Sequence, residues 1–506
     1  MRIFVFLVAA CAFGQIGGPP PSSQPARANQ LPLSGRTGQS GGATAIETPV
    51  PGATTSVNTI NPAIQVQGPY TGSAEGRMPF SGKLSLRDAI ERGLRSNLGA
   101  IGSSHAAGQA QGQTRVARAA LLPNVNGSLS ETVEQLNLQA AGLRFRIPIP
   151  GASIPSVVGP FNYFDLRATL SQSVVDVAAW KNRRSADENL QAARLSSNDA
   201  RDLVVLAVGG AYLQVIAAEA RVQSARAQVD AANALYLQSA QQRSVGLIAQ
   251  IDVNRTRVQL LTQQQRLASL RNDLAKQKIN LARMTGLPPN DRFDLADAVP
   301  FAAAPTLTLE DALKQGFSER SDLKAAEAQV RAAERARTAA RAERLPSVSV
   351  TADYGVIGTN PAHAHGTFSV IGSLRFPIWQ GGRIEGDVEQ ADAALAQRHS
   401  ELEDTRGRIE ADVRNAYLDL DTARGQVDVA RENLEVSQQN LTLTRQRYEA
   451  GVSDNVTVVQ SQESVADADL DFINSVFAFN IAKLSLARAI GRADEKLQQF
   501  LTARPR

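Results

Sequence analysis

The feature that most constrains the fold is a long segment that occurs twice in the chain. One copy begins SVGLIAQ, continues as a polar run and closes on LARMTG, while the other begins AGVSDN and closes on LARAIG. Gly246 precedes Gly286 by 40 residues, and Gly451 precedes Gly491 by the same 40. A helical segment copied at fixed length indicates that the length itself is functional.

Further matched segments show that most of the chain is duplicated. LSLRDAIERG is matched by LTLEDALKQG at an offset of 223, and AYLQV is matched by AYLDL at an offset of 205. The smaller second offset means that the first copy carries 18 extra residues between Pro123 and Ala211. We therefore predict two structural repeats, 84–290 and 307–497, each with a helix, two β-strands and a long helical hairpin.

The N-terminus predicts secretion. An apolar run from Ile3 to Phe13 follows Arg2; it is too short to span a bilayer as a helix and is typical of a signal peptide, predicted over residues 1–14. Two processing schemes remain open. Ala12-Phe13-Gly14 resembles a small-x-small cleavage site, whereas the residues up to Cys11, the single cysteine, resemble a lipobox that would leave Cys11 lipidated.

Residues 15–80 are rich in Pro, Gly, Ser, Thr and Gln. Such a segment buries too little apolar surface to offset its ordering entropy, so we predict a disordered leader, with order beginning at Leu84.

Alternating apolar and polar residues predict two β-strands in each repeat. The second repeat alternates over 348–356 and again over 368–378, and the first repeat has weaker versions over 125–129 and 164–174. Runs of about 10 residues suit transmembrane β-strands, although a half-exposed soluble hairpin has the same pattern. Four strands cannot close a barrel and an open sheet edge is not viable in lipid, so membrane strands require several chains to share one barrel.

The remaining sequence predicts long helices. Val177 to Arg243 contains no proline and has a helical composition, which allows one helix on the order of 100 Å long. Apolar residues then recur at every seventh position in both copies, which predicts helices packed side by side with coiled-coil-like geometry. The two rows are Val253, Leu260, Leu267, Leu274, Leu281 and Val458, Val465, Phe472, Phe479, Leu486.

Taken together, these features resemble the TolC family of outer-membrane channels, over about residues 84–497. The motifs that carry the resemblance are QRSVGLIAQIDVNRTR, RYEAGVSDNVTVVQSQ, RFPIWQGGR and the paired LARxxG endings. The resemblance implies an α+β membrane protein. Long helical hairpins would form a periplasmic α-barrel, and four strands per chain would join a 12-stranded barrel shared by a homotrimer in the outer membrane. It also implies short equatorial helices, here over 84–96 and 307–319.

The family further implies a passive duct of a tripartite efflux or type I secretion system. Its hairpin tips touch a periplasmic adaptor (membrane fusion) protein, which connects to an inner-membrane transporter. Glycine suits a reversal of antiparallel helices, and the apolar residues beside it can contact a partner helix, although the same residues could serve only to cap the hairpin. The predicted adaptor-docking tips are Val245, Gly246, Leu247, Ala450, Gly451 and Val452.

The family closes its tunnel near the tips, often with carboxylates one or two turns after the tip glycine. Asp252 matches this position, whereas its equivalent in the second repeat is Thr457 and the nearest acid is Asp454. We therefore predict a periplasmic gate in which Asp252 and Asp454 pair with the nearby Arg243 or Arg447.

Other function classes have little support. Lys+Arg 53 against Asp+Glu 49, interspersed along the helices, argues against nucleic-acid binding. His363 and His365 have metal-like spacing but lack further ligands, so we predict an exposed loop, no metal or cofactor, and no enzyme. The alternatives left open are a periplasmic structural or adaptor coiled coil without a pore and a secreted hydrolase using the His pair. The substrate is not determined by the sequence.

Overall fold

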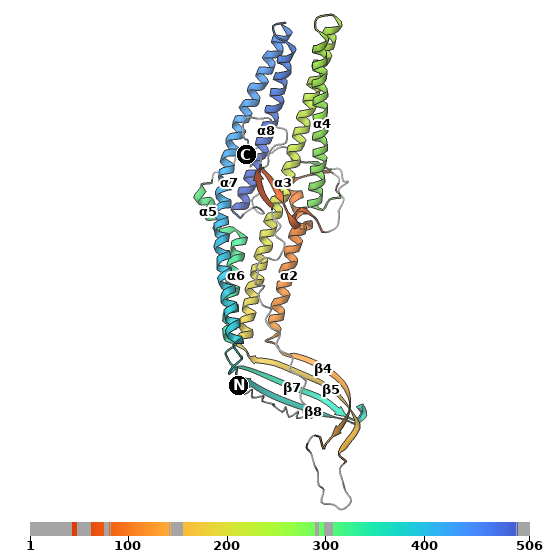
Figure 1. The fold of residues 1–506 in the computed structure, drawn as a ribbon, viewed down its shortest axis with the longest axis vertical. Helices are drawn as coiled ribbons and strands as arrows, with labels where there is room; N and C mark the ends of the chain where they lie inside the picture. The colour runs from red at the N-terminus through yellow and green to blue at the C-terminus, as the bar shows by residue number, and fades with distance from the viewer. Residues whose placement is uncertain are drawn as a thin grey trace, which may run out of the picture. The chain divides into compact units, whose positions relative to one another are not determined.

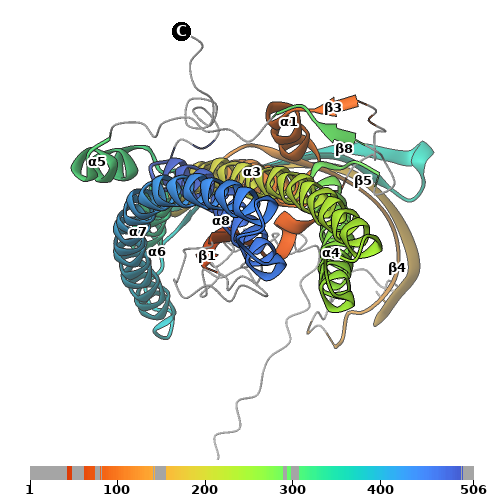
Figure 2. The same cartoon turned by 90° about the horizontal axis from the view of Figure 1, so that it is seen from above.

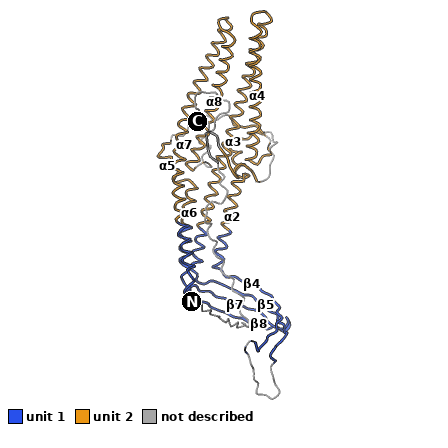
Figure 3. Tube along the Cα trace, in the orientation of Figure 1, with its two compact units in different colours: residues 1–33, 112–187, 332–395 blue, residues 34–111, 188–331, 396–506 orange. Residues whose placement is uncertain are grey.

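A computed structural model describes residues 43–47, 62–74, 80, 82–140, 142, 155–288, 293–297, 307–491 and 493 (Figure 1). These residues form two compact units, coloured separately in Figure 3. Among the described residues, unit 1 comprises 112–187 and 332–395, and unit 2 comprises the rest.

Unit 1 contains one four-stranded antiparallel sheet in the order β4-β5-β7-β8. Its strands are β4 (Asn124–Asn137), β5 (Val157–Val175), β7 (Ser347–Gly358) and β8 (Ala364–Arg375). Each repeat thus contributes two strands, as predicted. The strands of the first repeat have 14 and 19 residues against 12 and 12 in the second, so part of the extra length of the first repeat lies in its strands.

The sheet has one apolar and one polar face because its residues alternate in register. Val125 lies opposite Leu170, and Ala352 lies between Leu170 and Val370 on the same face. Many large side chains of that face are exposed in the single chain: Val125, Leu129, Val133, Leu166, Tyr354, Phe368, Val370 and Leu374. On the other face, Arg167 forms ion pairs with Asp165 and Asp353. Such a division suits a sheet with lipid on one side and water on the other.

The helices occur in matched pairs, one member from each repeat. They are α1 (Leu86–Ser96), α2 (Leu98–Ala119), α3 (Val177–Ser244) and α4 (Gln250–Thr285), followed by α5 (Leu309–Glu319), α6 (Ser321–Ala342), α7 (Arg383–Glu449) and α8 (Asn455–Ala489). The uninterrupted 68 residues of α3 confirm the predicted long helix.

The predicted short helices are α1 and α5, and both begin in the same way. The Ser85 hydroxyl accepts a hydrogen bond from the Asp88 backbone N–H, and the Thr308 hydroxyl accepts one from Asp311 N–H. These caps satisfy amides that lack a partner in the first helical turn.

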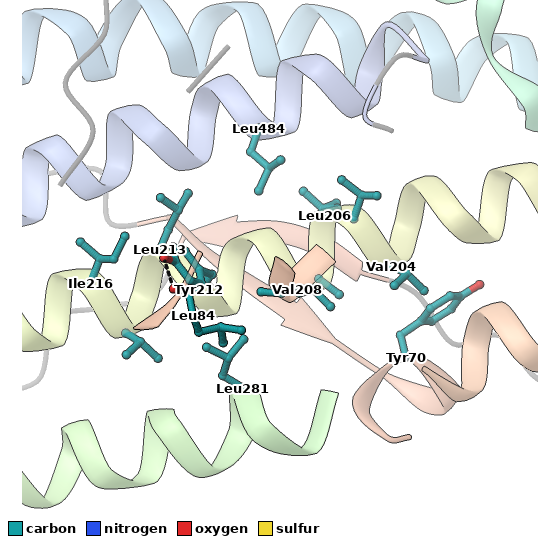
Figure 4. Packing of buried hydrophobic residues seen from close by; sticks show 14 of the residues in the cluster. Tyr70, Leu84, Val204, Leu206, Val208, Tyr212, Leu213, Ile216, Leu281 and Leu484 are labelled. Atoms are coloured by element: carbon teal, nitrogen blue, oxygen red, sulfur yellow. Dashed lines mark hydrogen bonds between the residues drawn. The ribbon is translucent and has the colours of Figure 1, made fainter. Parts of the chain in front are cut away.

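The apolar core of unit 2 forms where the long helices meet the short ones. One cluster joins α3 with residues of β3 (Gly82–Leu84), α4 and α8, and a second joins α7 and α8 with α5. Tyr212 is fully buried in the first cluster, and its hydroxyl lies 2.9 Å from the Leu84 carbonyl oxygen (Figure 4). The same hydroxyl lies 2.8 Å from an Asp297 carboxylate oxygen. Val253, Leu267 and Val458 of the seven-residue rows are also buried, so those rows are packing positions as predicted.

Two described helices, α3 and α8, contain 18-residue windows apolar enough to cross a membrane. Of these windows 78% and 67%, respectively, are buried inside the protein, which is typical of core helices.

The expectation of a disordered leader up to residue 80 is wrong for its described parts. β1 (Ala43–Glu47) pairs with β2 (Pro62–Val66), and a 3-10 helix, η1 (Gly68–Thr71), follows. Tyr70 is buried, and the Asn97 side-chain amide donates to the Tyr70 carbonyl at 2.8 Å. Composition could not reveal this, because the partner of the segment lies elsewhere in the chain.

The predicted signal peptide over 1–14 and the processing site at Cys11 lie outside the described residues.

Candidate functional site

The two hairpin tips are matching turns in unit 2. Gly246 and Gly451 have φ of 77° and 75°, a left-handed conformation that costs little only for glycine. Leu247 N–H donates to the Gln242 carbonyl at 2.9 Å, and Val452 N–H donates to the Arg447 carbonyl at 2.9 Å. These bonds close the ends of α3 and α7 in the same Schellman arrangement, so the predicted tips are helix reversals of identical backbone design.

The tips expose apolar side chains to solvent. Val245 is 66% exposed, Leu247 74% and Val452 68%, and Ala450 is also exposed. Ile251, just after the first turn, is 58% exposed. Neither the glycine turn nor the capping bonds require these side chains to be apolar, so the tips present a surface suited to a protein partner.

The predicted gate residues do not pair as expected. Asp252 lies in the first turn of α4 and pairs with Arg255 at 3.4 Å. Among the described residues, neither Arg243 nor Arg447 forms an ion pair with Asp252 or Asp454. Within one chain those pairs are not formed, because Asp252 pairs with Arg255 and the Asp454 carboxylate binds at the start of α8.

Asp454 is instead the N-cap of α8. Its carboxylate accepts the Thr457 backbone N–H at 3.0 Å and the Thr457 hydroxyl. Hydrogen bonds from the Thr457 hydroxyl and backbone lower the pKa of Asp454, so this exposed carboxylate is ionised at neutral pH.

Two contacts that sequence reasoning missed join the hairpins at their tips. The Tyr448 hydroxyl donates to the Gln242 side-chain oxygen at 2.7 Å, and the Asn455 amide donates to the Asp252 carbonyl at 3.4 Å. At the offset of 205, Tyr448 corresponds to Arg243 of the first repeat, and Gln242 corresponds to Arg447 of the second. The tyrosine at 448, where the first tip has an arginine, is the signal that could have identified this contact.

Further along, the hairpins are joined by polar contacts and enclose a polar space. The Arg221 guanidinium donates to Asn474 at 2.7 and 3.0 Å, and Arg266 lies 3.9 Å from Asp467. A cavity of about 250 Å³ lies between all four helices. Its polar lining includes Gln228, Gln259, Gln263, Gln438 and Gln462. An amide-lined space of this kind suits water better than an apolar ligand, so the interface between the hairpins is only partly apolar.

The histidine pair does not form a metal site in the described part of the chain, where no group of three or more His, Cys, Asp or Glu side chains could hold a metal ion. His363 ends the 3-10 helix η2 (Pro361–His363), and its ring bonds Asn360. His365 lies within β8 opposite Ile357, so the prediction of a loop is wrong for His365.

Comparison with known proteins agrees with this geometry. A family model described as "Outer membrane efflux protein" matches residues 103–287 and 312–492, one match in each repeat. The outer membrane protein OprJ of Pseudomonas aeruginosa is 26% identical over 62% of this chain and 65% of its own length. The outer membrane protein TolC of Vibrio cholerae is 22% identical over 64% of this chain and 76% of its own length.

Solved structures share the fold. The CmeC outer membrane channel of Campylobacter jejuni superposes with a TM-score of 0.70 at 16% identity, covering 90% of this chain and 97% of CmeC. The outer membrane protein VceC of Vibrio cholerae gives a TM-score of 0.67 at 19% identity, covering 80% of this chain and 96% of VceC. With both repeats matched by the family model, the chain belongs to the outer membrane efflux protein family.

Proposed function

We propose that this chain is the outer-membrane channel of a tripartite efflux or type I secretion system. It would act as a passive duct for substrates delivered by an inner-membrane transporter through a periplasmic adaptor. The observation that carries this proposal is the family match of two repeats that combine an amphipathic sheet with helical hairpins ending in exposed apolar tips. A periplasmic coiled coil without a pore would leave that sheet unexplained.

A homotrimer completes the sheet. Within the described part of the chain, β4 and β8 each have one unpaired edge, and lipid offers no water to satisfy an open edge. Three copies of the four strands would close a barrel of 12 strands.

The helices offer matching surfaces for the same assembly. Figures 1 and 2 both place α4 and α7 at opposite sides of the helical layer of unit 2. α4 exposes Ile251 and Val258, seven residues apart, and α7 exposes Val429, Val436 and Leu443 at the same spacing. Rows at a seven-residue spacing support packing of α4 in one copy against α7 in the next.

The apolar tips would bind the adaptor, and the contacts between hairpins would hold the duct closed. In this proposal, breaking the Tyr448–Gln242 hydrogen bond lets the second hairpin move away from the first. Asp252 and Asp454 would line the entrance as carboxylates, each held by residues of its own hairpin rather than by Arg243 or Arg447.

Membrane fractionation tests the central proposal. The full-length chain should be recovered in outer membranes as a trimer that dissociates on heating in detergent. Recovery as a soluble periplasmic monomer would contradict both the channel and the trimer.

Tip docking is tested by adding charge to the apolar turns. Leu247→Asp with Val452→Asp should abolish crosslinking to the adaptor while the trimer still assembles, because an aspartate cannot be buried cheaply against an apolar partner surface. Gln250→Glu adds charge beside the tip without removing an apolar side chain and serves as the control. Equal crosslinking by both variants would exclude the tips as the docking site.

A further inference from the structure

An ion-paired cluster lies on the polar face of the sheet. Asp165 and Arg167 are near the middle of β5, and Asp353 is near the middle of β7. Asp353 lies directly opposite Thr169, two residues after Arg167, so all three charged side chains share one face. They alternate with the apolar positions, such as Leu166, that form the other face.

The Arg167 side chain crosses the neighbouring strand. Arg167 lies opposite Gly355 of β7, and Gly355 lies opposite Thr367 of β8. Because Arg167 Nη2 is 3.4 Å from the Thr367 hydroxyl oxygen, the guanidinium passes over Gly355 to reach the second strand along. A Cβ atom at position 355 would lie only 3.0 Å from Arg167 Cβ. The glycine therefore leaves the space in which the arginine lies flat against the sheet.

Two carboxylates hold the arginine in this position. Arg167 Nε lies 3.3 Å from an Asp165 carboxylate oxygen, and Arg167 Nη1 forms a second, shorter ion pair with Asp353. Asp353 also accepts a hydrogen bond from the Ser369 hydroxyl of β8. One arginine against two aspartates leaves the cluster with one surplus negative charge in each chain.

The surrounding positions add little charge. The cluster occupies three adjacent rows of paired residues across the four strands. Apart from the cluster itself, the only ionisable side chain in these rows is that of His365. The other members of the rows are Asn126, Ser128, Ser130, Thr169, Gly355, Ile357, Thr367 and Ser369.

In the proposed trimer the polar face lines the interior of the membrane barrel, and the cluster recurs once per chain at the same level. Lipid behind the wall has a low dielectric constant, which concentrates the field of the surplus charges in the water-filled interior. The Debye length is about 10 Å at 0.1 M salt and about 3 Å at 1 M, so the field reaches passing solutes in dilute salt and is screened in concentrated salt.

We propose that Asp165, Arg167 and Asp353 form a charge filter in the membrane part of the channel that favours cationic over anionic solutes. Arg167 sets the strength of the filter, because it cancels one of the two carboxylates while its flat position keeps a cation out of the path. This inference rests on the proposed function, in which the polar face lines the channel.

A series of charge variants tests the filter. The full-length trimers are placed in planar bilayers under a gradient of dilute KCl, and the reversal potential gives the permeability ratio of K⁺ to Cl⁻. The ratio should rise about twofold in Arg167→Gln, fall about twofold in Asp165→Asn and favour Cl⁻ in Asp165→Asn with Asp353→Asn. Arg167→Lys keeps the charge and should keep the wild-type ratio. His365 is present in every variant, so the differences do not depend on it.

A matched control changes the same charge on the opposite face. Glu131 lies opposite Phe164 on the apolar face, and its carboxylate accepts a hydrogen bond from the Asn162 amide at 3.3 Å. Glu131→Gln should leave the permeability ratio unchanged. A shift in Glu131→Gln without one in Asp165→Asn would place water on the other face and overturn the filter.

The remaining outcomes separate the filter from the channel. If wild-type trimers conduct but the charge series leaves the permeability ratio unchanged, the filter is wrong and the channel stands. If wild-type trimers do not conduct, the proposed function fails and the filter fails with it. Asp165→Asn breaks only the longer of the two ion pairs, so it decides the question if the double variant does not assemble.

Discussion

The two hairpin tips share one backbone and differ in their side chains. Both turns place a glycine at positive φ and close with the same pair of backbone hydrogen bonds. The helices that follow begin differently, because Asp454 caps α8 whereas Ala249, at the start of α4, has no side-chain oxygen to offer. Duplication therefore preserved the reversal itself, which depends on backbone conformation, while the polar contacts diverged.

The same contrast is found at the junctions between the short helices. At the offset of 223, Asn97 follows α1 where Arg320 follows α5, and both are buried. Asn97 binds the backbone of η1, whereas Arg320 pairs with Asp322 at 2.7 Å and Asp412 at 2.8 Å. One repeat uses a neutral side chain to hold the N-terminal segment, and the other uses a buried cation to join α6 to α7.

The largest effect should come from removing that cation. Arg320→Ala leaves two carboxylates without this partner and should destabilise the fold by about 3 kcal/mol. This value is at the low end for breaking a buried ion pair, because Asp412 is partly exposed. Thermal unfolding followed by circular dichroism measures it. Arg408→Ala, which removes an exposed arginine 4.0 Å from Asp322, is the control and should cost under about 1 kcal/mol.

The pH dependence sharpens this prediction. Burial raises the pKa of Asp322, but hydrogen bonding and charge from Arg320 outweigh it, so the pKa is lowered overall. A lowered folded-state pKa stabilises the protein above the unfolded value of about 3.9 and loses that contribution as pH falls through the folded value. The difference between wild type and Arg320→Ala should therefore be full at neutral pH and shrink in strong acid. A difference independent of pH would point to packing instead of charge.

A smaller loss of stability should distinguish Tyr212 from Tyr417, the tyrosines of the two AYL motifs. Tyr212 is fully buried and bonds Asp297, whereas its counterpart Tyr417 is only partly buried. Tyr212→Phe should lower the free energy of unfolding by about 1.5 kcal/mol. This is the low end for a hydrogen bond to a charged group, because Asp297 is exposed. Tyr417→Phe should have less effect in the same unfolding experiment, and equal losses would show that the hydroxyl at 212 has no special role.

The tip contact should govern opening of the duct. Tyr448→Phe removes one hydrogen bond worth about 1 kcal/mol, which corresponds to an approximately fivefold shift toward the open state. Single-channel recording in planar bilayers measures the open fraction. Arg243→Ala changes the equivalent position of the first tip, where no such bond is formed among the described residues, and should leave the open fraction unchanged. If both variants raise the open fraction equally, the hydrogen bond between Tyr448 and Gln242 does not hold the duct closed.

The smallest effect should be local to the helix starts. Asp454→Ala removes the cap of α8 and should speed hydrogen exchange of the Thr457 amide, while Ala249→Asp should slow exchange in the first turn of α4. Because the pKa of Asp454 is lowered, its protection should be present at neutral pH and disappear in strong acid. Unchanged exchange at Thr457 would mean that the cap contributes nothing to the tip.

Periodicity and repetition were sufficient to predict most of the fold. Alternation predicted four strands, and the absence of proline predicted α3. The family resemblance located both tips, and the glycine matched between the repeats agreed with it. These features are local, so the residues that encode them are neighbours in sequence. The partners of Tyr448 and Tyr70 could not be predicted in this way. Tyr448 and Gln242 are 206 residues apart, and which polar side chains meet depends on how two separate hairpins approach.

The unpaired edges of β4 and β8 have a consequence for the cell. In the proposed trimer, a newly secreted chain cannot complete its own hydrogen bonds and must meet two others before its sheet is closed. The yield of finished channels then depends steeply on the supply of chains, and a modest fall in synthesis removes a larger share of channels. Until the trimer assembles, the unpaired strand edges and the apolar face of each chain stay exposed. Chaperones and proteases can bind them there.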